Sequence, residues 1–214
     1  VFVAVPGCEL DFALGNFMVL AHEHLSYFTE YSLRRMMSAV GLQNIRTRTL
    51  SYSHGILCAW GIHGDDPRPS RILTSMNHED SSLFQTFVQK SKTLLEKLQS
   101  RANALAARGK TLGLYGAPRA LPGLLETGVP PRIFDGDSAK HGAYFSGSPN
   151  PVEPPNELIQ NPVDELWILP IHHDRAIRDY LDGEILPNAK ISVLSVMDFA
   201  KMIRDNRLPE STYV

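Results

Sequence analysis

Two histidines and a glutamate stand side by side near the start of the chain, in the order His22, Glu23, His24. A helix-forming segment follows a few residues later. Histidine takes or gives a proton near neutral pH more readily than other side chains, and an adjacent carboxylate can orient it or balance its charge. His24 and Glu23 are therefore candidate catalytic residues. The alternative interpretation is a solvated loop with local capping bonds.

These histidines do not have the spacing of a zinc site. In the HExxH motif the two imidazoles lie four residues apart on one helix face, whereas His22 and His24 are only two residues apart. The chain has two cysteines, Cys8 and Cys58, and no CxxC pair. We therefore assign no metal ligands.

The composition excludes several classes of protein. The 214 residues are 43% hydrophobic and 21% charged, as in an ordinary globular protein. A net charge of -2 provides no general attraction to nucleic acid or to an anionic membrane. Two cysteines suit a reducing compartment, and no apolar run reaches the roughly 20 residues of a membrane helix. We expect a cytoplasmic protein with a small-molecule substrate and no nucleic-acid or membrane partner.

The first part of the chain is predicted to contain three strands and one helix. Residues 1–6 have the pattern of a buried strand. A helix is predicted from Thr29, which can cap it, to Val40, and Gly41 would end it. Two strand-like runs within 43–62 predict an antiparallel hairpin.

Two residues of this part are candidate substrate ligands. Tyr27 can donate a hydrogen bond from its hydroxyl, with core packing as the alternative. His54 lies at the break of the hairpin, where its imidazole faces either a cleft or the solvent.

A polar segment and a long helix are expected next. Residues 63–80 contain Pro67 and Pro69 and are typical of a linker. Ser82 and Gln85 have the spacing of a capping box, which predicts a helix over 82–108. This helix would act as a spacer between two domains.

The remainder of the chain predicts strands that alternate with helices. This alternation is typical of a parallel, Rossmann-like sheet flanked by helices. The expected strands are 111–115, 131–135, 165–170 and 190–194, and the expected helices are 119–127, 174–181 and 196–203.

Six residues fall where such a sheet binds ligands, at or near the carboxyl ends of its strands. Asp135 occupies the position at which dinucleotide-binding folds hydrogen-bond a ribose, although the full GxGxxG pattern is absent. Each of these residues also has a purely structural interpretation. The two glycines could only permit a tight turn, and the tyrosine could pack in the core. The acid and the lysine could lie in a surface turn, and the histidine could stand next to a helix cap. The candidate substrate-binding residues are Gly113, Tyr115, Gly116, Asp135, Lys140 and His172.

Several blocks of the sequence occur in the order found in S-adenosylmethionine-dependent sugar C-methyltransferases. The chain resembles the carboxyl-terminal half of these enzymes over nearly its whole length. The matching blocks are Val3 to Pro6, Glu23 to Phe28, His54-Gly55, Gly113 to Ala117, Asp135 to Gly142 and Val152 to Pro155.

The resemblance implies a fold with three parts. Residues 1–62 would be the carboxyl-terminal part of a methyltransferase sheet with its β-hairpin. Residues 63–110 would be a linker and long helix, and residues 111–214 a Rossmann-like substrate-binding domain. The glycine-rich loop that binds the cofactor lies before this region in the family, so the chain is expected to be a fragment that is inactive alone.

The resemblance also implies a reaction. A methyl group would pass from S-adenosylmethionine to a carbon next to a ketone of a sugar nucleotide or a related carbonyl compound, with His24 as the base and Glu23 beside it. Departures from the family pattern at Ala21, Ala120-Leu121 and Ile171-His172 lie on the substrate side. A non-catalytic module that binds a nucleotide or sugar nucleotide is the alternative, and an assembly domain built on the helix 82–108 is a third.

Overall fold

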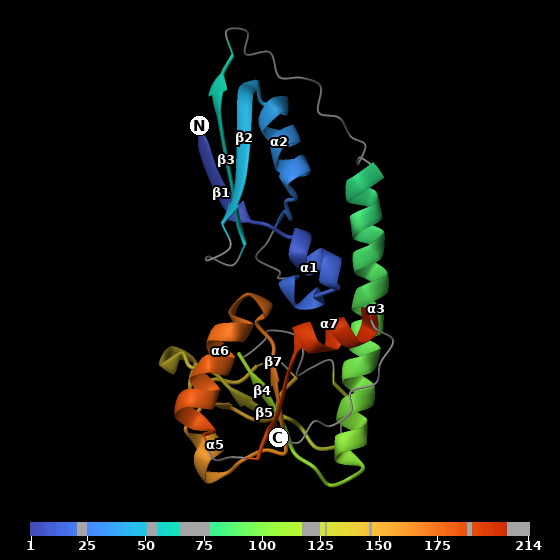
Figure 1. Ribbon diagram of the computed structural model, residues 1–214, viewed down its shortest axis with the longest axis vertical. Coiled ribbons are helices and arrows are strands. Elements are labelled where there is room, and N and C mark those ends of the chain that lie inside the picture. Colours follow the sequence, from blue (N-terminus) through green and yellow to red (C-terminus); the bar gives the residue numbers. More distant parts are fainter. Residues whose placement is uncertain are drawn as a thin grey trace. The chain divides into compact units, whose positions relative to one another are not determined.

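The computed structural model contains two compact units, residues 1–91 and 92–214 (Figure 1). It describes residues 1–20, 25–50, 55–64, 78–116, 125–126, 128–145, 147–187 and 190–204. A mixed α/β fold was predicted, and the structure confirms it: an antiparallel sheet lies in the first unit and a parallel sheet in the second.

The sheet of the first unit has three strands in the order β1-β3-β2. Strand β3 (Ile56–His63) lies in the middle and runs antiparallel to both β1 (Phe2–Pro6) and β2 (Leu42–Leu50). The predicted hairpin is confirmed, and its register shifts once between Gln43 and Arg46. This arrangement is consistent with the hairpin that closes a methyltransferase sheet.

Helix α2 (Glu30–Ala39) begins at the predicted cap. The Thr29 hydroxyl accepts a hydrogen bond from the Ser32 amide at 3.0 Å, and the Thr29 amide donates one to the Ser32 hydroxyl at 2.9 Å. These reciprocal bonds satisfy two amides that a helix start would otherwise leave unpaired. The helix then packs on the sheet through a buried cluster of Leu33, Met37, Leu42, Leu57 and Ala59.

A short helix, α1 (Glu9–Leu14), and the 3₁₀ turn η1 (Phe17–Val19) follow β1. The Phe12 ring stacks on Phe87 of α3 with 4.3 Å between ring centroids. Gly15 ends α1 with φ +73°, and a Cβ added there would lie 2.6 Å from the backbone carbon of Lys90. Only glycine allows the backbone of this turn to approach α3 so closely.

Helix α3 (His78–Ala106) begins before the predicted start. The prediction that Ser82 and Gln85 form a capping box is wrong, because Ser82 already has a turn of helix in front of it. Within its second half, Leu94, Leu98 and Ala102 are buried. No helix in the described part of the chain has both the length and the apolar content needed to span a membrane.

The second unit is built on a five-stranded sheet in which every neighbouring pair is parallel. Its order is β6-β5-β4-β7-β8, so the chain adds two strands on one side of β4 and then returns to add two on the other. The Rossmann-like sheet is confirmed, and β6 is an additional two-residue strand. The strands are β4 (Leu112–Tyr115), β5 (Arg132–Phe134), β6 (Val152–Glu153), β7 (Glu165–Ile168) and β8 (Ser192–Ser195).

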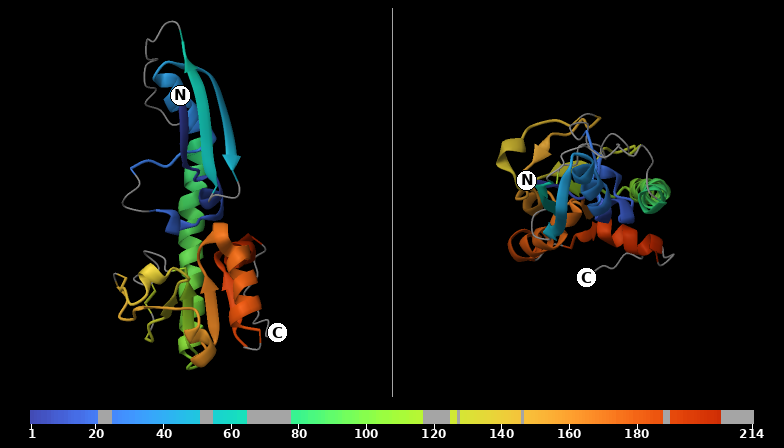
Figure 2. Two further views of the ribbon diagram at one scale, coloured as in Figure 1. Left: turned by 90° about the vertical axis from the view of Figure 1, so that its left-hand side faces the viewer. Right: turned by 90° about the horizontal axis from the view of Figure 1, so that it is seen from above.

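Helices cover both faces of this sheet (Figures 1 and 2). On one face, α6 (Asp174–Tyr180) and the π-helical turn η4 (Leu181–Ile185) pack on Tyr115, Phe134 and Ile168. On the other face, the Trp167 ring meets Phe199 of α7 (Val196–Arg204) edge-on at 5.1 Å. The short elements η2 (Ser138–Lys140), α5 (Glu157–Gln160) and η3 (Ile171–His173) complete the unit.

A buried ion pair joins α3 to the sheet, on the face that α7 also covers. The Glu165 side chain is only 2% exposed, and its carboxylate accepts hydrogen bonds from the Arg101 guanidinium at 3.1 and 2.5 Å. The Trp167 indole also donates to Glu165, at 2.7 Å. A buried carboxylate needs such partners, because an unpaired charge away from water is costly.

Candidate functional site

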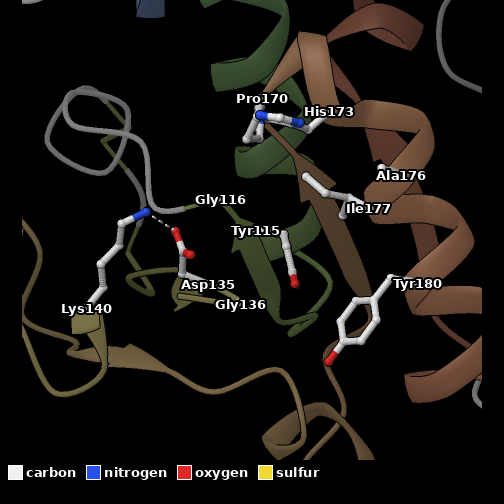
Figure 3. A pocket seen from close by; sticks show the side chains of 10 residues that line it. All are labelled: Tyr115, Gly116, Asp135, Gly136, Lys140, Pro170, His173, Ala176, Ile177 and Tyr180. Atoms are coloured by element: carbon white, nitrogen blue, oxygen red, sulfur yellow. Dashed lines mark hydrogen bonds and ion pairs between the residues drawn. The ribbon is translucent and has the colours of Figure 1, made fainter. Parts of the chain in front are cut away.

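A pocket of about 510 Å³ opens at the carboxyl ends of the parallel strands in the second unit (Figure 3). It lies where β4 meets β5 on one side and β7 on the other, the point at which the strand order reverses. In open parallel sheets this reversal leaves a crevice in which ligands bind. The residues that line it are Tyr115, Gly116, Asp135, Gly136, Lys140, Pro170, His173, Ala176, Ile177 and Tyr180.

Gly116 allows β4 to end against the segment that follows β7. Its φ is +96°, and a Cβ added there would lie 2.3 Å from Cγ of Pro170. The Gly116 amide donates to the carbonyl of Phe134 at 2.8 Å, which ties the turn to β5. Both the backbone conformation and the close approach therefore require glycine at this position.

Replacing Gly116 with alanine is expected to destabilise the second unit and to distort the pocket. A non-glycine residue in the left-handed region costs about 1–3 kcal/mol, and the clash with Pro170 adds to this cost. Gly142→Ala is the matched control, since Gly142 has φ +80° but open space around its Cβ position. Urea denaturation should show a larger loss for Gly116→Ala; equal losses would contradict the role of the Pro170 contact.

Tyr115 places a protonated hydroxyl in the pocket. The residue is only 5% exposed. Burial, with smaller contributions from Tyr180 and Asp135, raises the pKa of Tyr115 to about 12. The hydroxyl therefore remains a hydrogen-bond donor at physiological pH, and none of the described residues forms a hydrogen bond with it.

Asp135 follows β5 directly and is held from two sides. One carboxylate oxygen accepts from the Asp137 amide at 2.8 Å, and the other accepts from the Lys140 ammonium at 2.8 Å. The His141 ring nitrogen Nε2 lies 2.8 Å from the Asp135 carbonyl oxygen. The turn through η2 thus fixes the carboxylate in the wall of the pocket.

Helix α6 supplies the opposite wall. Within α6, Ala176 and Ile177 precede Tyr180 by four and three residues, the spacings that put side chains on one helix face, and His173 lines the pocket from the turn η3 just before the helix. His173, rather than the predicted His172, lines the pocket. Sequence reasoning did not identify Pro170 or the α6 residues, although the helical spacing after His173 was a usable signal.

The structure places the other predicted substrate ligands elsewhere or leaves them undescribed. Gly113 lies within β4, where an added Cβ would be 2.8 Å from a methyl carbon of Leu166, and it does not line the pocket. Tyr27 belongs to the first unit, and its ring lies 6.1 Å from that of Phe12. His54 and the two predicted catalytic residues, Glu23 and His24, lie outside the described residues.

The described residues do not form a cradle for S-adenosylmethionine at the end of β1. The Gly7 amide there donates to the Gly55 carbonyl at 3.0 Å, and an added Cβ would lie 2.9 Å from that oxygen. The chain's own backbone therefore closes this turn.

Comparison with known proteins identifies the domain that carries the pocket. Residues 73–186 match the family described as the C-methyltransferase C-terminal domain. The match covers more than half of the chain and all residues that line the pocket. No curated protein sequence matches the chain. The match confirms the resemblance found in the ordered sequence blocks, and the chain belongs to the C-methyltransferase C-terminal domain family.

Proposed function

We propose that this protein transfers a methyl group from S-adenosylmethionine to a carbon next to a ketone, in a sugar nucleotide or a related carbonyl compound. Membership of a C-methyltransferase family supports methyl transfer to carbon. The observation that carries the proposal is the pocket at the strand-order reversal, because it lies within the family match and has the size of a small-molecule site. In this proposal the second unit holds the acceptor.

The proposed chemistry begins with a proton transfer. A ketone acidifies the neighbouring C–H bond, since the enolate that forms places its negative charge on oxygen. A neutral imidazole can then remove the proton, and we assign this role to His24. Glu23 would orient the ring or balance the charge of the imidazolium. S-adenosylmethionine, when bound, supplies the electrophilic methyl group.

Binding to the whole protein provides the first test. Thermal denaturation should be measured with S-adenosylmethionine and with a panel of sugar nucleotides. A ligand present at 100 times its Kd stabilises the folded state by about 2.7 kcal/mol, which shifts the Tm measurably. We expect stabilisation by S-adenosylmethionine and by at least one sugar nucleotide or related carbonyl compound.

Product analysis then separates the two candidate functions. A mass increase corresponding to one methyl group, in an acceptor that stabilises the protein, supports the enzyme. Stabilisation by a sugar nucleotide with no methylation and no effect of S-adenosylmethionine would instead support the non-catalytic binding module. That module would use the same pocket, since all its lining residues lie in the second unit.

A further inference from the structure

The chain is fixed in place a few residues after His24, the proposed base. The Phe28 carbonyl accepts a hydrogen bond from the Cys8 amide at 3.0 Å. The Glu30 amide donates one to the Glu9 carboxylate at 2.8 Å. His24 precedes Phe28 by four residues, and four residues span at most about 14 Å. The position of Phe28 therefore limits the space that His24 can reach.

Thr29 provides a further anchor between these two contacts. The residue is only 8% exposed, and its hydroxyl oxygen accepts the capping bond from the Ser32 amide. A hydroxyl also has one proton to donate. A carboxylate oxygen of Asp80 lies 2.8 Å from this hydroxyl, whereas the Ser32 hydroxyl lies 3.1 Å away. Because an ionised carboxylate is the stronger acceptor, the proton goes to Asp80.

Asp80 differs from the other partner of this cap in its distance along the chain. Ser32 is three residues from Thr29, so its bonds hold the first turn of α2 only against itself. Asp80 is 51 residues away and belongs to the first turn of α3. A bond between distant segments sets where one element lies relative to another. Asp80 therefore fixes the start of α2 against α3.

Apolar packing gives the same part of α3 a defined place in the first unit. Leu83 and Tyr27 both pack against one buried cluster, which consists of Cys8, Phe12 and Phe87. Leu83 lies on α3, less than one turn of helix after Asp80, and Tyr27 lies two residues before Thr29. The two segments that the Thr29–Asp80 bond joins thus also share an apolar core, so the bond is made between well-supported partners.

The family match places the two ends of this bond in different regions of the chain. It begins at residue 73, so Asp80 belongs to the C-methyltransferase C-terminal domain, whereas Thr29 and His24 precede it. We propose that the C-terminal domain contributes Asp80 as a positioning residue, which holds Thr29 and thereby the segment that carries the base. The inference deepens the proposed function and rests on it. It gives this domain a second task besides holding the acceptor.

Kinetics of the whole protein test this role. Asp80→Ala removes the bond between α2 and α3 and leaves the reciprocal capping bonds of α2 in place. We expect kcat for methyl transfer to fall about 10- to 100-fold, because a misplacement of about 1 Å can cost that much. The KM of the acceptor and the Kd of S-adenosylmethionine should change little. Asp80→Asn keeps an acceptor oxygen for Thr29 and should restore most of kcat.

Two further variants separate positioning from a general weakening of α2. Ser32→Ala is the matched control, since it removes a hydrogen bond from the same cap but keeps the contact of Thr29 with Asp80. We expect it to lower the Tm at least as much as Asp80→Ala does, with a much smaller loss of kcat. Glu96→Ala removes an exposed acid from the same helix and should change neither quantity.

Hydrogen exchange reports on the segment without any assay of activity. The amides of Thr29 and Glu30 are both hydrogen-bonded, so their exchange rates measure local opening. NMR of the whole protein should show several-fold faster exchange of both amides in Asp80→Ala. The rates in Asp80→Asn and Glu96→Ala should stay close to those of the unaltered protein.

The proposal is overturned if Asp80→Ala leaves these exchange rates unchanged, or if its loss of kcat is no larger than that of Ser32→Ala. Failure of Asp80→Asn to restore kcat would overturn it as well. An active protein that tolerates Asp80→Ala would reject this inference and leave the proposed function standing. Absence of methyl transfer to every acceptor by the unaltered protein would reject the proposed function, and this role of Asp80 with it.

Discussion

His24→Ala is expected to lower the rate of methyl transfer by the whole protein about 10²–10⁴-fold, the usual loss when a general base is removed. The substitution removes the imidazole that we assign to the proton next to the ketone. We assign His24 no contact with the methyl donor, so we expect the affinity for S-adenosylmethionine to remain nearly intact. Steady-state kinetics with the acceptor, together with calorimetric titration of the cofactor, measure both quantities.

His22→Ala is the control for this experiment. His22 is two residues away and carries the same side chain, but the family pattern assigns it no catalytic role. We expect a much smaller loss of rate. Similar losses for the two substitutions would favour the alternative interpretation, in which this segment only forms a loop with capping bonds.

Glu165→Ala is expected to destabilise the second unit by about 3–5 kcal/mol, the range found when one partner of a buried ion pair is removed. The Arg101 side chain is only 15% exposed and would lose its bidentate partner. The Trp167 indole would also lose the acceptor of its hydrogen bond. Because α3 is joined to β7 through this pair, the loss should appear as a lower urea midpoint.

The fluorescence of Trp167 can report this unfolding transition. Trp60 is the other tryptophan and lies in the first unit, so a Trp60→Phe background isolates the signal of the second. Asp179→Ala is the surface control, since Asp179 is 74% exposed in its pair with Arg175 and such pairs contribute about 0–1 kcal/mol. Glu165→Gln keeps an acceptor oxygen, so its urea midpoint should fall between those of Glu165→Ala and Asp179→Ala. A Glu165→Ala midpoint equal to that of Asp179→Ala would contradict this role of the buried pair.

Elements with strong local signals were predicted correctly from the sequence. Thr29 and the apolar spacing after it specified α2, because capping and periodicity act within one or two turns of helix. The alternation of strands with helices after residue 111 specified the parallel sheet of the second unit. The ordered sequence blocks likewise identified the family that the match over 73–186 confirms.

Short elements and one helix start could not be predicted in this way. Helix α1 has six residues and strand β6 has two, which is too few for a periodic pattern to stand out. The Ser82–Gln85 pattern was misleading because a capping box is only one of several contexts for those residues. The helix continued over residues 78–81, with Asp80 accepting a hydrogen bond from Thr29 at 2.8 Å.

The sequence alone thus determined the fold class, the family and the edge of the sheet at which a ligand site should lie. It named Tyr115, Gly116, Asp135 and Lys140, and the structure gathers these four around one pocket. Only the tertiary structure decided that His173 lines this pocket, because adjacent side chains leave a 3₁₀ turn in different directions and the placement of the turn selects one of the two histidines. It alone also revealed the two carboxylates around Lys140, since the charge balance at a side chain depends on how the chain folds around it.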